Sequence, residues 1–509
     1  MMYDVHERRV LIIGGGLVGL CASLFLSHHG VESMVVEKHT GTSPQPKARR
    51  INLRTMELFR QIGIASDVLH AADALADFQG MAAGRTLADA RRLPFTLPGG
   101  VPNWDDISPV SACLCAQDAL EPVLRGLAAD RGVELRFGAE VADFVADGAG
   151  VTATVSAEDG STHTVRADYL IAADGARGRT REKLDIGRGG RGSLGSAANV
   201  YFRADLSDLV RGREFNLCQI EHPAAPGGLV SVNGTDRWIF MTAATEDRAE
   251  GEWVDLIRTA LGAAGVDVEI LSVLRWEPGM FVADRFSAGR VFLAGDAAHV
   301  MPPYAAAGAN TGIQDAHNLA WKLAMVLTGV AAPELLESYH AERRPIGWFT
   351  ADQSSIRSAD LRRPYAASAD GTPLADPLAL ILGYQYPSGA FIADGSTAAT
   401  DRLDLAGQPG TRLPHHRLND GGSTLDLVGR RLTLLTGSAA GPWHPAAVAS
   451  PVEVRQVDGV GVDWNTEVGV GENGAILVRP DHIVAWRCPE PGDNPRSQLD
   501  TALRRVLGN

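Results

Sequence analysis

Residues 9–20, which read RVLIIGGGLVGL, decide the fold. The first half is a continuous apolar run typical of a short buried strand, and three glycines stop it. Residues 17–29 then have the pattern of a helix, and Val35, Val36 and Glu37 that of a second strand. A strand, a glycine turn, a helix and a strand within about thirty residues predict the start of a parallel, doubly wound α/β sheet.

The glycines and one acidic residue of this unit indicate a dinucleotide site. Gly14, Gly16 and Gly19 open the helix, where free N–H groups and the positive end of the helix dipole favour a phosphate. Glu37 follows the first glycine by 37 − 14 = 23 residues, where a carboxylate can hold a ribose diol. The motif does not by itself distinguish NAD from FAD.

A second segment favours the flavin. Residues 289–299, GRVFLAGDAAH, read as a buried strand that ends at Asp296, and an aspartate there suits the hydroxyls of a sugar-like chain. Pro302, Pro303, Gly308 and Asn310 follow, before a long helix predicted over about 311–328. The free N–H groups of that helix start would stabilise the negative charge of a reduced flavin.

Composition excludes several classes of partner. The net charge of −14 and the pI of about 5.5 disfavour nucleic acid and anionic membranes, which both require a basic face. No apolar run is long enough for a membrane-spanning helix. The five cysteines are scattered without metal-site spacing, so we expect reduced thiols, no metal and a cytoplasmic protein.

The pattern along the chain predicts an α/β protein of several domains. We expect a doubly wound domain in two parts, 1–180 and 284–395, around an inserted antiparallel sheet at 181–283. Phe202, Trp238, Phe240, Trp276 and Phe281 there would suit an apolar polycyclic ligand, although such aromatics more often form core. A last domain is expected over 400–509.

Four motifs together resemble the class A FAD-dependent aromatic hydroxylases, the group of p-hydroxybenzoate hydroxylase, and within it the aromatic polyketide and phenol hydroxylases. The first is the glycine segment with Glu37, and the second is PKAR at 46–49 with RTMEL at 54–58. The third is ADGAR at 173–177, and the fourth runs from Gly295 and Asp296 through NTGIQDA at 310–316 to NLAWKL at 318–323. The resemblance covers essentially the whole chain.

The resemblance implies that the two-part domain is an FAD-binding domain of the glutathione-reductase type and that 181–283 is the substrate domain. It also implies a non-covalent FAD site and its residues. In the family these positions flank the pyrophosphate, the adenosine ribose, the ribityl chain and the isoalloxazine, and Asp174 and Gly175 would serve FAD and the nicotinamide together. No catalytic base can be assigned; Tyr304 and Pro303 are the only candidates, and His299 is expected to pack rather than to act as a base. The cofactor-binding residues expected in this way are Gly14, Gly16, Leu17, Val18, Gly19, Glu37, Lys38, Lys47, Arg49, Gln117, Val141, Asp174, Gly175, Asp296, Pro303, Gly308, Ala309 and Asn310.

The chain departs from the family pattern at several positions. Lys47 stands where most members have Arg, Arg50 and Ala305 where they have Gly, and Gly178 where they have Ser; Ala306 stands where Gly is also frequent. The last domain resembles the thioredoxin-like C-terminal domain of the same subgroup. Cys488 is its only cysteine, so we expect no dithiol redox role.

By resemblance, NADPH or NADH would reduce FAD, and O2 would form a flavin C4a-hydroperoxide that hydroxylates a phenolic, polyketide-type small molecule. Baeyer–Villiger insertion or a multi-step oxidation on the same scaffold is an alternative that the motifs around FAD cannot separate. A pyridine-nucleotide dehydrogenase and an FAD-binding protein without turnover are two others. The chain is expected to be a monomer or a homodimer.

Overall fold

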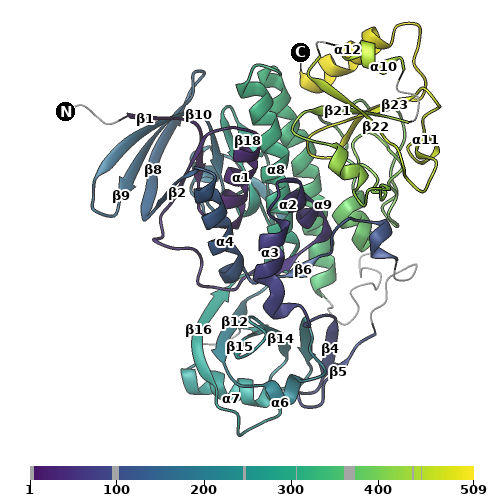
Figure 1. The fold of residues 1–509 in the computed structure, drawn as a ribbon. Coiled ribbons are helices and arrows are strands. Elements are labelled where there is room, and N and C mark those ends of the chain that lie inside the picture. Colours follow the sequence, from purple (N-terminus) through teal and green to yellow (C-terminus); the bar gives the residue numbers. More distant parts are fainter. Residues whose placement is uncertain are drawn as a thin grey trace.

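The computed structural model describes residues 5–94, 102–244, 248–304, 306–359, 373–437, 441–448 and 450–508. Figure 1 shows a mixed sheet with its helices in the centre, a second sheet below them, and the C-terminal residues in yellow beside α8 and α9. This arrangement confirms the predicted α/β class, with a doubly wound FAD-binding part, a substrate part and a C-terminal part. The sheet of the substrate part is mixed rather than antiparallel, because one of its strand pairs is parallel.

The central sheet has the strand order β18-β19-β10-β1-β2-β7. β1 pairs in parallel with β10 and β2, and β10 pairs in parallel with β19, so their carboxyl ends meet at one edge. β1 begins five residues before the predicted strand because its first residues pair with β10 from Val5 onward. The strands of this sheet and its antiparallel extension are β1 (Val5–Ile13), β2 (Ser33–Glu37), β7 (Glu134–Phe137), β8 (Ala139–Ala146), β9 (Val151–Ala157), β10 (Thr162–Ala172), β18 (Ser287–Ala288) and β19 (Val291–Leu293).

Helices α1 (Leu17–His28), α4 (Gln117–Asp130) and α8 (Ala307–Leu327) pack together beside this sheet (Figure 1). α1 is buried along most of its length, because sheet and helices enclose it. α8 begins four residues earlier than predicted. The short elements around this core are α2 (Leu53–Gln61), α3 (Ala65–Ala72), α5 (Thr180–Lys183), β3 (Arg50–Ile51) and β6 (Cys113–Leu114).

The second sheet has seven strands in the order β16-β12-β15-β14-β13-β4-β5. β4 and β5 come from residues 81–92, a stretch that the sequence assigned to the first domain. Helices α6 (Ser207–Val210) and α7 (Glu250–Leu261) lie beside this sheet. Its strands are β4 (Met81–Gly84), β5 (Arg91–Arg92), β12 (Ala197–Arg203), β13 (Leu217–Ile220), β14 (Gly227–Ser231), β15 (Arg237–Ala243) and β16 (Glu269–Trp276).

A small sheet connects the two larger ones. It consists of β11 (Arg188–Ser193), β17 (Gly279–Ala283) and β20 (His299–Val300), in that order. Gly189 pairs with Val282, and Val282 pairs with His299, so these three residues form one row across the sheet. β20 leads directly into Met301, Pro302 and Pro303.

The C-terminal sheet has the order β22-β21-β23-β24. β21 and β23 are buried at every position because apolar clusters cover both faces, one of them including Trp321 of α8. The long helix α9 (Glu337–Ala359) runs between this part and the central sheet. The elements of the C-terminal part are β21 (Leu432–Thr436), β22 (Val452–Gln456), β23 (Ala475–Val478), β24 (Val484–Cys488), α10 (Trp443–Ala446), α11 (Trp464–Glu467) and α12 (Pro495–Leu507).

The five cysteines are free and buried, and burial raises the pKa of the Cys113 thiol to about 11. Within the described ranges, none of the helices is both long and apolar enough to cross a membrane. The same ranges contain no group of three or more His, Cys, Asp or Glu side chains arranged to hold a metal ion.

Candidate FAD site

Three of the four motifs meet at one edge of the central sheet. Gly14 follows β1, Glu37 ends β2, Asp174 follows β10 and Asp296 follows β19, and these four strands are neighbours. Ligands of open parallel sheets bind outside the carboxyl ends of the strands. Residues up to 282 positions apart in the chain (296 − 14) therefore border one site.

The glycines of the first motif are required by close approach. Gly14 has φ +102°, and a Cβ there would lie 2.3 Å from the carbonyl oxygen of Ala173, the residue before Asp174. A Cβ at Gly19 would lie 1.9 Å from the carbonyl oxygen of Gly14. Neither position accepts a side chain without movement of the backbone, so α1 can start where it does only with glycine.

The first turn of α1 has backbone donors for a phosphate. The N–H groups of Gly16 and Val18 have no hydrogen-bond partner in the described part of the chain, and a Cβ at Gly16 would meet only Glu121, at 3.6 Å. The Leu17 N–H instead donates to Oε1 of Glu121, 2.9 Å away. Burial raises the pKa of the Glu121 carboxyl, while hydrogen bonds from Ser43, Gln117 and Leu17 and the charge of Lys47 oppose that rise.

Glu37 lies against the glycine loop. Its Oε2 accepts a hydrogen bond from the Gly15 N–H at 2.7 Å, and its Oε1 accepts one from the His39 N–H at 2.9 Å. Lys38, the next residue, is exposed. Val141 lies in β8 opposite Val155 and packs against the central core, where it adds no polar group to the site.

Lys47 and Gln117 both act on Glu121, which contacts the first turn of α1. Lys47 is exposed, and its charge opposes the rise in pKa that burial causes in both Glu121 and Asp296. Gln117 exchanges hydrogen bonds with Ala48 and donates to Glu121 at 2.7 Å.

Arg49 points elsewhere. Its guanidinium donates to the carbonyl oxygens of Ser231 and Asn216, both at 2.6 Å, and to Oδ1 of Asn216 at 2.7 Å. Burial lowers its pKa to about 10. Arg49 thus joins the central part to the seven-stranded sheet, a contact that its place in the PKAR motif did not indicate.

The Asp174 side chain bends back toward the turn that follows it. Its Oδ2 accepts hydrogen bonds from the N–H and the hydroxyl of Thr180, at 3.0 and 2.8 Å, and its buried Oδ1 has no partner. A Cβ at Gly178 would lie 2.2 Å from the Asp174 carboxyl carbon. The glycine at 178 therefore leaves the space that the carboxylate occupies. Gly175 has φ +80°, which suits the tight turn.

Asp296 is exposed to solvent, yet the surrounding protein raises the pKa of its carboxyl by desolvation, against the charges of His299 and Lys47. The carboxyl is thus reachable by solvent although protein surrounds it, and we call the sheet edge from Gly14 to Asp296 the FAD groove. A carboxylate in that position can accept hydrogen bonds from the hydroxyls of a ribityl chain.

Three buried side chains support this turn from behind. His299 Nε2 and Asp315 Oδ2 are 2.6 Å apart, and the Gly295 N–H donates to the same oxygen at 3.2 Å. Arg343 Nε donates to Asp315 Oδ1 at 2.8 Å. Burial favours the neutral Asp315 carboxyl, but His299 and Arg343 lower its pKa below the ordinary value. His299 is packed in an ion-paired cluster, as expected from the sequence.

The start of α8 has two unpaired amides and one strained residue. The N–H groups of Gly308 and Ala309 have no partner in the described chain, so they can face a negative pyrimidine edge. Ala306 has φ +53°, in the left-handed region that favours glycine. Ala305 lies outside the described residues.

The Asn310 side chain holds this start in place rather than pointing to a ligand. Its Nδ2 donates to the carbonyl oxygens of Ala306 and Arg50, both at 2.9 Å, and its Oδ1 accepts from the Asn52 N–H at 3.0 Å. Pro303 is exposed just before it, and the Tyr304 ring lies 5.7 Å from the Arg357 guanidinium.

The seven-stranded sheet turns an apolar face toward the central part. Tyr201 and Ile239 pack with Ala116, the residue before α4, and with half-buried Leu217 and Met241. Phe202, Trp238 and Phe240 alternate with these residues and point to the other face, where they pack against α6 and α7. Strand alternation thus directs those three aromatics into the core of the second sheet, the more frequent role of such residues, and away from the face toward the central part. Trp276 faces the same side as Tyr201, and Phe281 lies in β17 outside this sheet.

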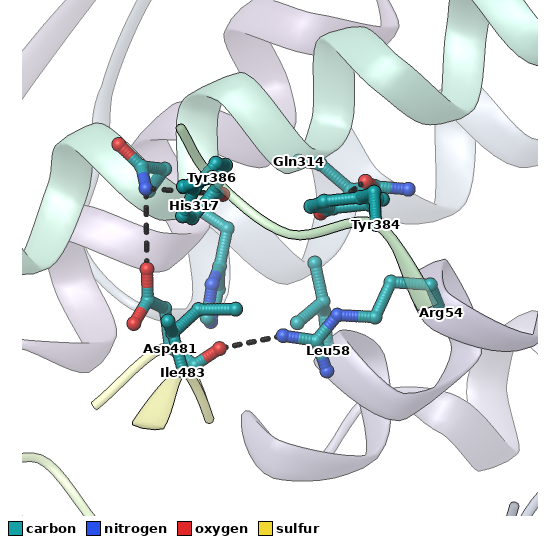
Figure 2. Close-up of a pocket in the computed structure, with 9 residues that line it drawn as sticks. Arg54, Leu58, Gln314, His317, Tyr384, Tyr386, Asp481 and Ile483 are labelled. Carbon is teal, nitrogen blue, oxygen red and sulfur yellow. Dashed lines mark hydrogen bonds between the residues drawn. The ribbon is translucent and has the colours of Figure 1, made fainter. Parts of the chain in front are cut away.

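Buried charged side chains join the C-terminal part to α8 and α9. Glu342 of α9 accepts hydrogen bonds from Arg479 at 2.7 Å and from Lys322 and Asn318 of α8 at 2.8 and 2.7 Å. Figure 2 shows Arg54, Gln314, His317, Tyr384 and Tyr386 around Asp481, where they enclose a cavity of about 10 Å³, room for about one water. This cavity belongs to the interface and not to the FAD groove.

Sequence comparison supports the assignment. Residues 7–354 match the family described as FAD binding domain, and residues 406–509 match that described as aromatic-ring hydroxylase, C-terminal. The chain is 42% identical to a polyketide hydroxylase of Streptomyces halstedii, over 99% of this chain and 97% of the other. It is 40% identical to the tetracenomycin A2 monooxygenase-dioxygenase of Streptomyces glaucescens, with the same two coverages.

Structure comparison agrees with the sequence. The crystal structure of aklavinone-11 hydroxylase in a ternary complex with FAD and aklavinone superimposes with a TM-score of 0.90. The two sequences are 34% identical, and the match covers 99% of each chain.

Proposed function

The chain belongs to the family of FAD-dependent aromatic-ring hydroxylases, and from this we propose that it uses reduced nicotinamide and O2 to add oxygen to a phenolic ring of an aromatic polyketide. The observation that carries the proposal is the meeting of the Gly14 loop, Asp296 and the start of α8 at one edge of the central sheet, opposite an apolar face of the second sheet. Relatives named for polyketides and for tetracenomycin supply the substrate class.

The residues of the groove fit FAD. The free amides of Gly16 and Val18 would bind its pyrophosphate, Glu37 its adenosine ribose, and Asp296 its ribityl hydroxyls. The amides of Gly308 and Ala309 would face the pyrimidine edge, where negative charge develops on reduction. When bound, FAD would transfer electrons from the nicotinamide to O2. A phenol cannot activate O2 by itself, so the cofactor supplies this chemistry.

The protein itself positions the substrate and excludes water from the site. The apolar face of Tyr201, Ile239, Leu217 and Met241 would hold a flat ring system and exclude water from the reacting carbon. We propose Tyr304 as the hydroxyl that hydrogen-bonds the substrate near Pro303. Tyr304→Phe should then lower the rate of oxygenation while the rate of FAD reduction stays within about twofold.

A second candidate is a multi-step oxidation on the same site. It is favoured by the Streptomyces glaucescens relative, whose name joins monooxygenase and dioxygenase activities. A single monooxygenation adds one oxygen atom to the substrate for each NAD(P)H oxidised. Repeated monooxygenation keeps that ratio but adds more oxygen atoms to each substrate molecule, whereas a dioxygenation step adds two oxygen atoms without a further NAD(P)H.

The test is a single experiment on the purified protein. Its absorbance spectrum should contain flavin bands, and a polycyclic phenol should accelerate NADPH oxidation and gain one oxygen atom by mass. Two or three added oxygens would support the second candidate, and oxygen inserted into a ring carbon–carbon bond would identify a Baeyer–Villiger enzyme. A protein that remains without flavin after addition of FAD would refute the proposal.

A further inference from the structure

A cluster of arginines without carboxylate partners lies on the small sheet that leads into the FAD groove. Arg188 of β11 and Arg285 after β17 are exposed, and neither makes an ion pair or hydrogen bond within the described residues. Arg344 of α9 donates through Nε to the Ala283 carbonyl oxygen at 3.1 Å, and it also has no carboxylate partner there. Many other arginines of this acidic chain are paired with carboxylates, so the cluster is a local exception to the net charge of −14.

Aromatic rings lie between these cations. The Arg188 guanidinium carbon is 4.2 Å from the Phe281 ring centre, and that of Arg344 is 5.9 Å from the Trp348 ring centre. Trp348 is 39% exposed, and its ring lies over Gly189, where a Cβ would be 3.5 Å away. An indole that is left this open on a basic surface offers a flat face for stacking.

His340 is a further member of this cluster, near Arg285 and Arg344. His340 of α9 accepts a hydrogen bond at Nδ1 from the Phe286 N–H, 3.2 Å away. Its pKa is lowered by burial first and then by the charges of Arg344 and Arg285, so both charges act on the imidazole. We call Arg188, Arg285, His340, Arg344 and Trp348 the arginine patch.

The patch is close to the FAD groove. Gly189, the neighbour of Arg188, shares a row with Val282 and His299, and His299 is three residues from Asp296. Two strand spacings of about 4.8 Å separate the ends of that row by about 10 Å. The patch therefore lies about one sheet's width from the strand that leads into the loop at 301–303.

We propose that the arginine patch docks the phosphates and the adenine of a reduced nicotinamide adenine dinucleotide phosphate. Guanidinium groups bind phosphate oxygens through paired hydrogen bonds, and the 2′-phosphate and pyrophosphate of NADPH supply such oxygens. The exposed Trp348 indole suits the adenine ring. This inference rests on the proposed function, since a hydroxylase of this type requires a nicotinamide that arrives, reduces FAD and leaves.

The experiment compares two double variants of the holoenzyme that lose the same charge. Arg188→Ala/Arg285→Ala removes patch arginines, and Arg211→Ala/Arg505→Ala removes two exposed arginines elsewhere. FAD reduction is followed by stopped flow against NADPH and against NADH, and NADP+ binding is measured by calorimetry. FAD content and circular dichroism check that each variant is folded.

The patch variant should raise the NADPH concentration for half-maximal reduction by about 10- to 100-fold, with the limiting rate within about twofold of wild type. The increase for NADH should be smaller, since NADH lacks the 2′-phosphate. An unchanged half-maximal concentration, or an equal increase in the control variant, would overturn the proposal. If NADPH does not reduce the wild-type flavin at all, the proposed function fails. The docking proposal is then decided by calorimetry alone. It is supported if NADP+ binds wild type and not the patch variant, and it is overturned if NADP+ binds neither protein or both.

Discussion

The Gly295 N–H donates to the Asp315 carboxylate at 3.2 Å, and this contact ties the turn that carries Asp296 to the middle of the molecule. The same carboxylate binds His299 and Arg343, and all of these side chains are fully buried. Arg343 in turn donates to the Tyr386 hydroxyl at 3.2 Å, which also accepts from Asn318, a partner of Asp481. A continuous chain of polar contacts thus runs from the FAD groove to the C-terminal part.

Asp315→Asn should destabilise the protein by about 3–5 kcal/mol, because it leaves the Arg343 charge buried without its carboxylate. FAD affinity should fall as well, since the Gly295 turn loses an acceptor. Urea denaturation and FAD titration measure the two effects. The exposed Asp77→Asn should change stability by less than about 0.5 kcal/mol. Equal stability of the two variants would contradict the assigned role.

Ala306→Gly should stabilise the protein by about 1 kcal/mol, because glycine adopts φ +53° without the steric cost of a Cβ. The neighbouring Ala307→Gly should do the opposite and lose about 0.5–1 kcal/mol, since Ala307 is the first residue of α8. The midpoints of urea denaturation of the two variants measure these changes in stability. If both lose stability, the left-handed conformation of Ala306 is not strained.

Gly19→Ala should abolish FAD binding, since its Cβ would lie 1.9 Å from the Gly14 carbonyl oxygen. The control is Gly126→Ala in α4, where a Cβ meets nothing within 4 Å. That variant should bind FAD normally and gain about 1 kcal/mol of stability from helix propensity. Retention of FAD after purification measures binding. A Gly19→Ala protein that is yellow from bound FAD would show that the loop moves to accommodate the added Cβ.

Stability should fall as the pH drops below about 6.5. Burial holds the pKa of His482 down at about 3, with further lowering by Arg54, and His29 is likewise lowered to about 3. The unfolded chain therefore binds protons before the folded one does, and this contribution to stability is complete above pH 6.5 and is lost on acidification.

His482→Asn removes one such group while keeping a residue that tolerates φ +61°. The free energy of unfolding of the variant should change less between pH 7 and pH 5 than that of wild type. The measurement is a series of urea titrations across this range. Identical slopes in the two proteins would count against a neutral, buried His482.

Met241→Ala should weaken substrate binding with little loss of stability, because its half-buried side chain is on the face toward the central part. Phe240→Ala, one residue away, should cost about 3–5 kcal/mol and leave the substrate affinity of the folded protein unchanged. Substrate titration and urea denaturation separate the two effects. A reversal of this pattern would place the substrate on the helix-covered face.

The sequence predicted the local parts of the site well. The Gly14 loop, Glu37 and Asp296 each sit where a strand ends, and the apolar runs before them identify those strands directly. Arg49 and Asn310 could not be placed in this way, since their partners Ser231 and Arg50 are far away in the chain. No periodicity of a segment says which distant carbonyl a long polar side chain will reach.

By itself, the sequence determined the dinucleotide loop, the parallel strands and the family, because short-range spacing of glycines, apolar runs and acidic residues encodes them. Only the tertiary structure decided which side of β12 and β15 faces the FAD groove, which charges surround Asp315, and where the arginine patch lies. Successive residues of a strand point to opposite sides, so a known strand leaves its face open until its partners are packed against it. That choice separates Tyr201 from Phe202, and with it the proposed substrate face from the core.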